Sequence, residues 1–203
     1  MTDTAQPTAD AVLTVDLDAT DLTWAEHRIA GAEQPARIAL LRADAERGTR
    51  TVMVRFPDGW TRDAVGNQPA GEEMAILDGE LRISGLVGAP GQMLVIEPRA
   101  TRSATSTADG TRAVVWFSGA GGGWADGEAE DAGSMELLSV EAGLERPARP
   151  GLNGAVALVE EAAGAVFDVD ADVLWPDARR WAFVPAGTAA PALEGPAIVH
   201  TWS

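Results

Sequence analysis

The chain has 203 residues, 46% of them hydrophobic, and a formal net charge of −16 at pH 7. This composition fits a folded protein of one or two domains, and the negative charge disfavours nucleic acid and anionic membranes as partners. Because the chain has no cysteine and no tyrosine, thiolate chemistry, disulfides and phenolic acids or bases are excluded. Chemistry would have to use carboxylates, arginines, two histidines, hydroxyls and backbone groups.

Residues 1–10 are small and polar and are expected to form a loose tail. They lack the basic and apolar regions of a secretory signal. No apolar run approaches the roughly 18–20 residues that a membrane span needs. We therefore expect a soluble, cytoplasmic protein.

The next segments contain short elements. Residues 12–17 alternate apolar and polar side chains, which predicts a weak strand. Residues 24–27 follow an acidic, capping-like segment and are predicted as a short helical turn. Residues 36–43 and 49–56 are predicted strands, joined by a hairpin loop that contains Gly48.

The stretch 66–81 is the centre of the predicted fold. A turn-rich approach leads to two acids and an apolar strand, and Asp78-Gly79 is a strong hairpin signal. A second apolar strand, 91–98, ends in a proline, which cannot donate to a β-ladder. A third follows at 112–117. This spacing of short strands is typical of a small antiparallel barrel.

Particular residues of this stretch resemble the cupin family. Cupins usually carry two histidines one residue apart, then a glutamate, then six residues and a glycine. Glu72 and Gly79 hold the last two places, and Gly71-Glu72-Glu73 resembles the "GGEE" run of the ChrR-type cupins. Pro98 and the turn through Thr101 resemble the second cupin motif. The resemblance implies an all-β cupin jelly-roll barrel.

The histidines of the cupin motifs are missing. Gly66 and Gln68 stand at the first pair, and Arg102 stands near the third. Transition-metal sites of this type use two or three imidazoles with a carboxylate, and His27 and His200 lie far from the motif in sequence. We therefore predict no metal and no cofactor, and the dioxygenase activity of related ChrR-type cupins is not carried over.

The composition changes after Ser118. Residues 119–134 are rich in glycine and acids, and they lack the Gly-Lys-Ser/Thr of a phosphate-binding loop. We interpret them as a linker. The alternative is a lid in which Trp124 covers the barrel mouth.

The remaining residues resemble the first part of the chain. Residues 151–164 align with 66–79 without a gap, and 181–188 align with 94–101. This repeat predicts a degenerate bicupin. An α-helix over 155–163 is the alternative, because that segment consists of good helix formers.

The second copy has alanines where the first is polar, with Ala157 aligned to Glu72 and Ala189 to Arg102. We therefore expect the second half to be structural. The predicted organisation is a flexible tail (1–10), a first cupin barrel (11–118), a Gly/acidic linker (119–134) and a degenerate second cupin half (135–203).

The cupin resemblance places Gln68 and Arg102 beside Glu72 in the barrel lumen. We predict these three as catalytic residues: Glu72 transfers a proton, while Arg102 and Gln68 stabilise negative charge. Arg62 and Asp63 lie on the approach loop. We expect a solvated loop, and the alternative is that these two side chains reach the barrel mouth. The predicted substrate-binding residues are Met74, Ile76, Arg55, Trp60 and Trp116.

The leading hypothesis is a metal-independent cupin enzyme that acts on a small organic molecule by proton transfer, in an isomerisation, cyclisation or elimination. The alternative is a non-catalytic cupin that binds or senses a small ligand. A structural protein that forms homodimers through its barrel sheets also stays open. The alternative to a functional site is that Glu72 and Arg102 form an internal ion pair left by a lost metal site.

Overall fold

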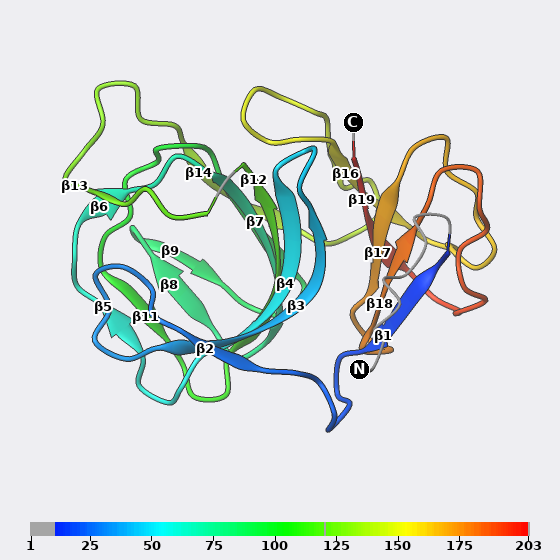
Figure 1. The fold of residues 1–203 in the computed structure, drawn as a ribbon, viewed down its shortest axis with the longest axis horizontal. Coiled ribbons are helices and arrows are strands. Elements are labelled where there is room, and N and C mark those ends of the chain that lie inside the picture. Colours follow the sequence, from blue (N-terminus) through cyan, green and yellow to red (C-terminus); the bar gives the residue numbers. More distant parts are fainter. Residues whose placement is uncertain (1–10, 120, 203) are drawn as a thin grey trace, which may run out of the picture.

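The computed structural model describes residues 11–119 and 121–202, and the predicted tail at 1–10 lies outside them. The described residues form strands and turns without a helix, which confirms the all-β prediction. No helix among them could therefore cross a membrane. Figure 1 shows two β units side by side, a larger one built mainly from the first part of the chain and a smaller one from the last part.

The larger unit is a barrel of two main sheets. Its seven-stranded sheet has the order β14-β10-β7-β12-β4-β3-β2, its four-stranded sheet has the order β5-β11-β8-β9, and β13 pairs with β6 at one end. The strands are β2 (Ala25–His27), β3 (Ala36–Asp44), β4 (Thr49–Arg55), β5 (Thr61–Arg62), β6 (Gly66–Asn67), β7 (Gly71–Asp78), β8 (Leu81–Ile83), β9 (Leu86–Gly88), β10 (Gln92–Ile96), β11 (Thr105–Thr107), β12 (Arg112–Ser118), β13 (Ala125–Asp126) and β14 (Met135–Ser139).

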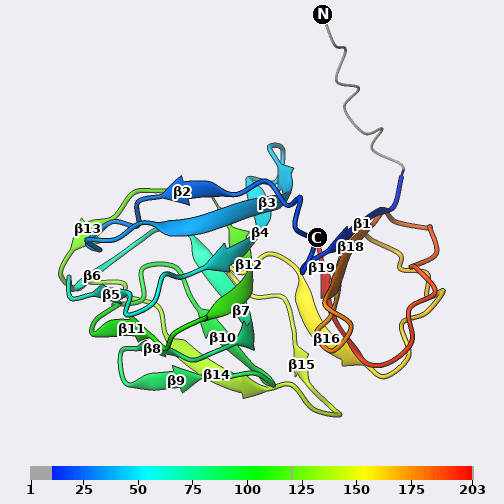
Figure 2. The same cartoon turned by 90° about the horizontal axis from the view of Figure 1, so that it is seen from below.

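The smaller unit is one six-stranded sheet with its loops, in the order β1-β18-β17-β19-β16-β15. Its first strand comes from the N-terminal part of the chain, as Figure 2 shows. The strands are β1 (Leu13–Asp16), β15 (Glu145–Arg146), β16 (Ala155–Val159), β17 (Ala171–Trp175), β18 (Arg180–Val184) and β19 (Ala197–Thr201).

Side-chain alternation along the strands divides the apolar residues between separate cores. On β7, Met74 and Ile76 face the inside of the larger barrel. Ala75 and Leu77 face the other way, into a core shared with the smaller sheet, where Leu174 and other residues of that sheet pack against them. The two large sheets therefore lie face to face, and each residue of β7 belongs to one core or the other.

Two predicted elements differ from the structure. Residues 25–27 form the edge strand β2 rather than a helical turn, because pairing with β3 satisfies their backbone groups. Asp78-Gly79 is a corner rather than a hairpin, since β7 and β8 belong to different sheets. Gly79 is required there: its φ is +70°, and a Cβ would lie 2.3 Å from Oγ1 of Thr111.

The predicted domain boundaries also divide the strands differently from the sheets. β1 was assigned to the first barrel but pairs with β18 of the smaller sheet. β14 was assigned to the second half but pairs with β10 of the larger barrel. β1 therefore joins the N-terminal part of the chain to the smaller sheet and links the two units. Such pairing over long sequence distances leaves no local signal.

The smaller sheet repeats the strand order of the larger one. The order β18-β17-β19-β16-β15 corresponds, strand for strand, to β10-β7-β12-β4-β3. Residues 155–159 form the strand β16 rather than a helix, but β16 corresponds to β4 and not to β7. The sequence alignment of 151–164 with 66–79 therefore matched β16 to β7 instead of β4. The strand order does pair β18 with β10 and β19 with β12.

A buried polar cluster joins the two face-to-face sheets. Glu73 of β7 points out of the barrel toward the smaller sheet, where Arg146 donates two hydrogen bonds to its carboxylate at 2.8 and 2.5 Å. Nε2 of His200 lies 2.9 Å from the same carboxylate. The His200 ring lies between Trp116 and Trp202, with centroids 5.5 and 4.1 Å away.

The second half contributes buried polar groups to this interface, at positions other than Ala157 and Ala189. Besides Arg146 and His200, the hydroxyl of Thr51 on β4 donates to the buried carboxyl of Asp172 on β17. The comparison of Ala157 and Ala189 with Glu72 and Arg102 did not indicate these groups, because they lie between the two sheets and not in the lumen.

We expect Arg146→Met to lower the free energy of unfolding by about 3–5 kcal/mol, because it leaves the Glu73 carboxylate buried without its guanidinium. Arg146 and Glu73 have side chains only 3% and 1% exposed. Adding Glu73→Gln should restore part of the loss in denaturant titrations. Arg82→Met is the control, since its pair with Glu80 is 57% and 33% exposed and such pairs contribute under about 1 kcal/mol. Equal effects at positions 146 and 82 would contradict this role.

The same cluster predicts a pH effect. Burial opposes ionisation of Glu73, but His200 and Arg146 outweigh it, so the pKa of Glu73 lies below its ordinary value of 4.5. Because the pKa is lower in the folded state, the ionised Glu73 carboxylate stabilises the fold above about pH 4.5. This contribution is lost as the pH falls through the folded-state pKa. The wild type should therefore lose its advantage over Glu73→Gln as acid is added. A difference in unfolding free energy that does not shrink as the pH falls below about 4.5 would contradict the assignment.

Candidate functional site

The candidate site is on the barrel face of β7, opposite the Glu73 cluster. Glu72 alternates with Glu73 and faces the lumen, together with Met74 and Ile76. In the register of the sheet, Glu72 lies beside Phe117 of β12 and Ile96 of β10. The Glu72 side chain is only 10% exposed. Its carboxylate therefore lies at one end of the apolar row that continues along β7 with Met74 and Ile76.

The structure brings the three predicted catalytic residues together. Gly66 and Arg102 exchange backbone hydrogen bonds of 3.1 and 2.7 Å, which carries Arg102 to the lumen. The amide of Gln68 donates to Glu72. The Arg102 side chain is 1% exposed, and its Nη2 is 3.6 Å from Oε1 of Glu72. This separation is too long for a hydrogen bond, so the two groups form an ion pair without one.

Arg62 also belongs to the site, although its loop was expected to be solvated. It lies on β5, is 5% exposed, and donates from Nη2 to the Thr105 hydroxyl at 3.2 Å. Burial lowers its pKa to about 10, with the charge of Arg102 adding to the effect and that of Glu72 opposing it. Asp63, the other residue of that loop, is exposed as predicted. A lone arginine beside an exposed acid carries no sequence signal for burial.

Arg50 is a second basic residue that the sequence did not indicate. It pairs across the sheet with Phe117, which in turn pairs with Glu72. Its guanidinium lies over the Phe117 ring at 3.9 Å. Burial lowers the pKa of Arg50, and the charge of Glu72 partly offsets this effect.

The predicted substrate-binding residues divide into two groups. Met74 and Ile76 line the barrel, and Trp60 is in the same core, where its indole N–H donates to the carbonyl of Gln34 at 2.9 Å. Arg55 is exposed beside a surface pocket, and Trp116 faces the smaller sheet. These last two are not brought to the lumen, because their side chains alternate to the outer faces of β4 and β12.

Trp124 packs against two residues of the site, Arg62 and Gly66. Its ring lies over the Arg62 guanidinium at 4.9 Å, and its indole N–H donates to Asp126 at 2.9 Å. β13, which follows it, pairs with β6. A Cβ built at Gly66 would lie 2.3 Å from the Trp124 ring and 2.5 Å from the Ala125 carbonyl. The segment predicted mainly as a linker thus packs onto the barrel, as in the lid alternative.

The residues at the cupin metal positions do not fit a transition metal. Gly66 has no donor atom, Gln68 offers a neutral amide, and Arg102 brings a positive charge. The Trp124 ring occupies the place into which a side chain at position 66 would project. His27 is exposed on β2, and His200 faces Glu73 on the other side of the sheet. The described residues contain no cluster of three or more histidines or acids with metal-binding geometry.

Comparisons with solved structures show the fold. The chain is similar to a candidate dioxygenase from Nostoc punctiforme (TM-score 0.69, 13% identity, covering 93% of this chain and 81% of that one). It is also similar to Escherichia coli YlbA, with a TM-score of 0.64 and 11% identity, covering 99% of this chain and 94% of that one. A third similar structure is a deletion mutant of Bacillus subtilis oxalate decarboxylase, with a TM-score of 0.50 and 10% identity, covering 98% of this chain and 78% of that one.

These neighbours are cupin-type proteins, so the cupin fold is confirmed. No protein-family model matches the chain, and no curated protein matches it. At such low identity the neighbours establish the fold alone, and the residues of the site have to support any argument about activity.

We expect Gly66→Ala to lower the free energy of unfolding by about 1–3 kcal/mol, because its Cβ would collide with Trp124 and the Ala125 backbone. Gly66 has no positive φ, so the change tests this contact and not backbone strain. Combining it with Trp124→Ala should recover part of the loss in denaturant titrations. No loss in the single variant would show that Trp124 does not pack on Gly66.

Proposed function

We propose that the larger barrel is a metal-independent site for a small organic molecule, with Glu72 transferring a proton. The single observation behind this proposal is the contrast between two adjacent glutamates. Glu73 is closed into a bidentate pair with Arg146 at 2.5 and 2.8 Å. Glu72 accepts a hydrogen bond from the neutral amide of Gln68. Its Oε1 lies 3.6 Å from Nη2 of Arg102.

This contrast supports a ligand site because buried charges that serve only structure are normally paired and hydrogen-bonded. Nη2 of Arg102 has no hydrogen-bond partner among the described residues. An oxygen atom of a ligand placed beside it would accept that hydrogen bond. The Glu72 carboxylate could then face a neighbouring carbon of the ligand.

The arrangement suits proton transfer next to a carbonyl. The Glu72 carboxylate removes a proton from the carbon, and the C–H electron pair moves to the carbonyl oxygen. Arg102 stabilises the oxyanion by a charge-assisted hydrogen bond, and Gln68 orients Glu72. Return of the proton from Glu72 to another atom of the substrate completes an isomerisation without an external reactant. A cyclisation or elimination could use the same proton transfer.

The repeated strand order supports one more proposal, that the chain is a duplicated cupin whose second copy keeps the sheet and lacks the lumen site. A non-catalytic binding or sensing protein is the second candidate function. Trp124 over the mouth favours it, because a covered lumen retains a ligand as well as it protects a reaction.

The test is a melting series on Glu72→Gln, Arg102→Leu and the double variant, together with a thermal-shift screen of small carboxylic acids and phenols. Each single variant should change stability by less than about 1–2 kcal/mol, since the pair is open, yet should abolish the ligand shift. Glu73→Gln is the matched control, because it removes the neighbouring carboxylate on the other face of β7.

Losses of about 3–5 kcal/mol in the single variants, recovery in the double variant and no ligand shift would contradict the proposal, because that pattern belongs to a closed ion pair. Turnover of a molecule that shifts the melting temperature distinguishes the enzyme from the binding protein.

A further inference from the structure

The lumen side chains around Glu72 carry more positive than negative charge. All 15 basic residues of this acidic chain are arginines. Arg62 and Arg102 are buried, at 5% and 1% exposure, beside the single lumen carboxylate of Glu72. Arg50 also faces this carboxylate, and Glu72 partly offsets the effect of its burial. Buried charges are strongly destabilising unless they are compensated.

The two buried arginines still have hydrogen-bonding capacity. Nε of Arg62 and Nη2 of Arg102 have no hydrogen-bond partner among the described residues. The other interactions of Arg62 are a neutral hydroxyl, that of Thr105, and the face of the Trp124 ring. Neither carries a negative charge. Among the described residues, no anion accepts a hydrogen bond from Nε of Arg62 or Nη2 of Arg102.

We infer that the barrel binds a small organic carboxylate, held by Arg62 and Arg102 and covered by Trp124. This inference rests on the proposed function and specifies its substrate class. A carboxylate has the geometry and the charge that guanidinium groups bind best. Its carbon chain would lie along the apolar wall of Met74 and Ile76.

The position of Glu72 agrees with this assignment. Because Glu72 accepts a hydrogen bond from Gln68 and lies 3.6 Å from Arg102, it is beside the anion site and not inside it. A carboxylate bound by the arginines would place its adjacent carbon toward Glu72. The arginines would also stabilise the dianion that forms when that carbon loses a proton.

Trp124 is attached in a way that allows the mouth to open. The preceding Gly122 and Gly123 have φ values of +86° and +76°, which favour glycine. The following strand, β13, makes only a two-residue pairing with β6. Trp124 can therefore leave the mouth while the main sheets keep their hydrogen bonds.

The probe is propionate, with propionamide as its neutral counterpart and sodium chloride at equal ionic strength as the baseline. Propionate should raise the melting temperature of the wild type, and propionamide should not. Arg62→Met should weaken propionate binding by about tenfold or more in calorimetric titrations, because a charge-assisted hydrogen bond is lost. Arg82→Met, at a residue whose side chain is 57% exposed, should bind like the wild type.

A second readout concerns Trp124. Propionate should change the tryptophan fluorescence of the wild type, because engaging Arg62 alters the cation that lies on the Trp124 ring. The change should be absent in Trp124→Phe, which keeps an aromatic ring at the mouth. In buffer without carboxylate, Arg62→Met should melt no lower than the wild type, since it removes an uncompensated buried charge.

The inference is overturned if propionate and propionamide act alike, if sulfate stabilises the protein as much as propionate does, or if Arg62→Met binds propionate with unchanged affinity. A lower melting temperature of Arg62→Met without carboxylate would also overturn it. If a neutral molecule shifts the wild type and not Glu72→Gln, the inference fails while the proposed function stands. If propionate binding depends on Arg62 but no substrate is turned over, the carboxylate site stands and the proton-transfer proposal fails.

Discussion

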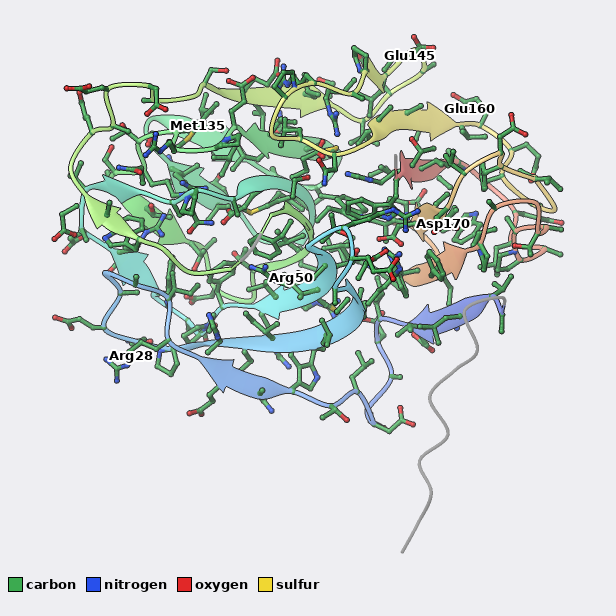
Figure 3. The ribbon with its side chains drawn as sticks, turned by 45° about the horizontal axis from the view of Figure 1, so that its top comes forward. Arg28, Arg50, Met135, Glu145, Glu160 and Asp170 are labelled. Atoms are coloured by element: carbon green, nitrogen blue, oxygen red, sulfur yellow. The ribbon has the colours of Figure 1, made fainter. Side chains whose placement is uncertain are left out.

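The alternation of side chains along β7 determines how the rest of this protein is organised. Glu72 and Glu73 are neighbours in sequence, and the strand sends them to opposite faces of the sheet. Glu73 enters the interface between the two units, where Arg146 and His200 hold it (Figure 3 shows the side chains that fill this interface). Glu72 enters the lumen. One strand therefore supplies both the link between the units and the reactive group of the proposed site.

The two carboxylates differ in their surroundings as much as in their direction. Around Glu73, aromatic rings exclude water and the charges are matched, so the site is closed to other molecules. Around Glu72 the positive charge is in excess and the hydrogen bonds are incomplete. Gly66, Gln68 and Arg102 supply one buried positive charge and no imidazole here, which suits the proposed anion site better than a cation site.

Local sequence patterns predicted much of the larger barrel. The strands around 36–44, 49–55 and 92–96 follow from alternation and turn residues, and the cupin motif placed Gln68 and Arg102 beside Glu72. These predictions depend on neighbours in sequence or on a known motif. The cupin motif also indicated the fold that the structural neighbours share.

Other features depend on contacts that no local pattern encodes. The burial of Arg62 results from a strand of two residues that pairs with β11 and from a tryptophan 62 positions away. The pairing of Glu73 with Arg146 spans 73 residues. The sequence alignment of 151–164 with 66–79 matched alanines and glycines, which agree by composition alone. The correspondence between the two sheets is visible only in their strand orders, which the sequence does not show.

The most direct test of the account is a crystal structure of the protein grown with propionate. The account predicts a carboxylate within hydrogen-bonding distance of Arg62 and Arg102, with its adjacent carbon facing Glu72 and Trp124 over the mouth. A lumen filled by side chains, with Arg102 closed onto Glu72 and propionate absent, would contradict it.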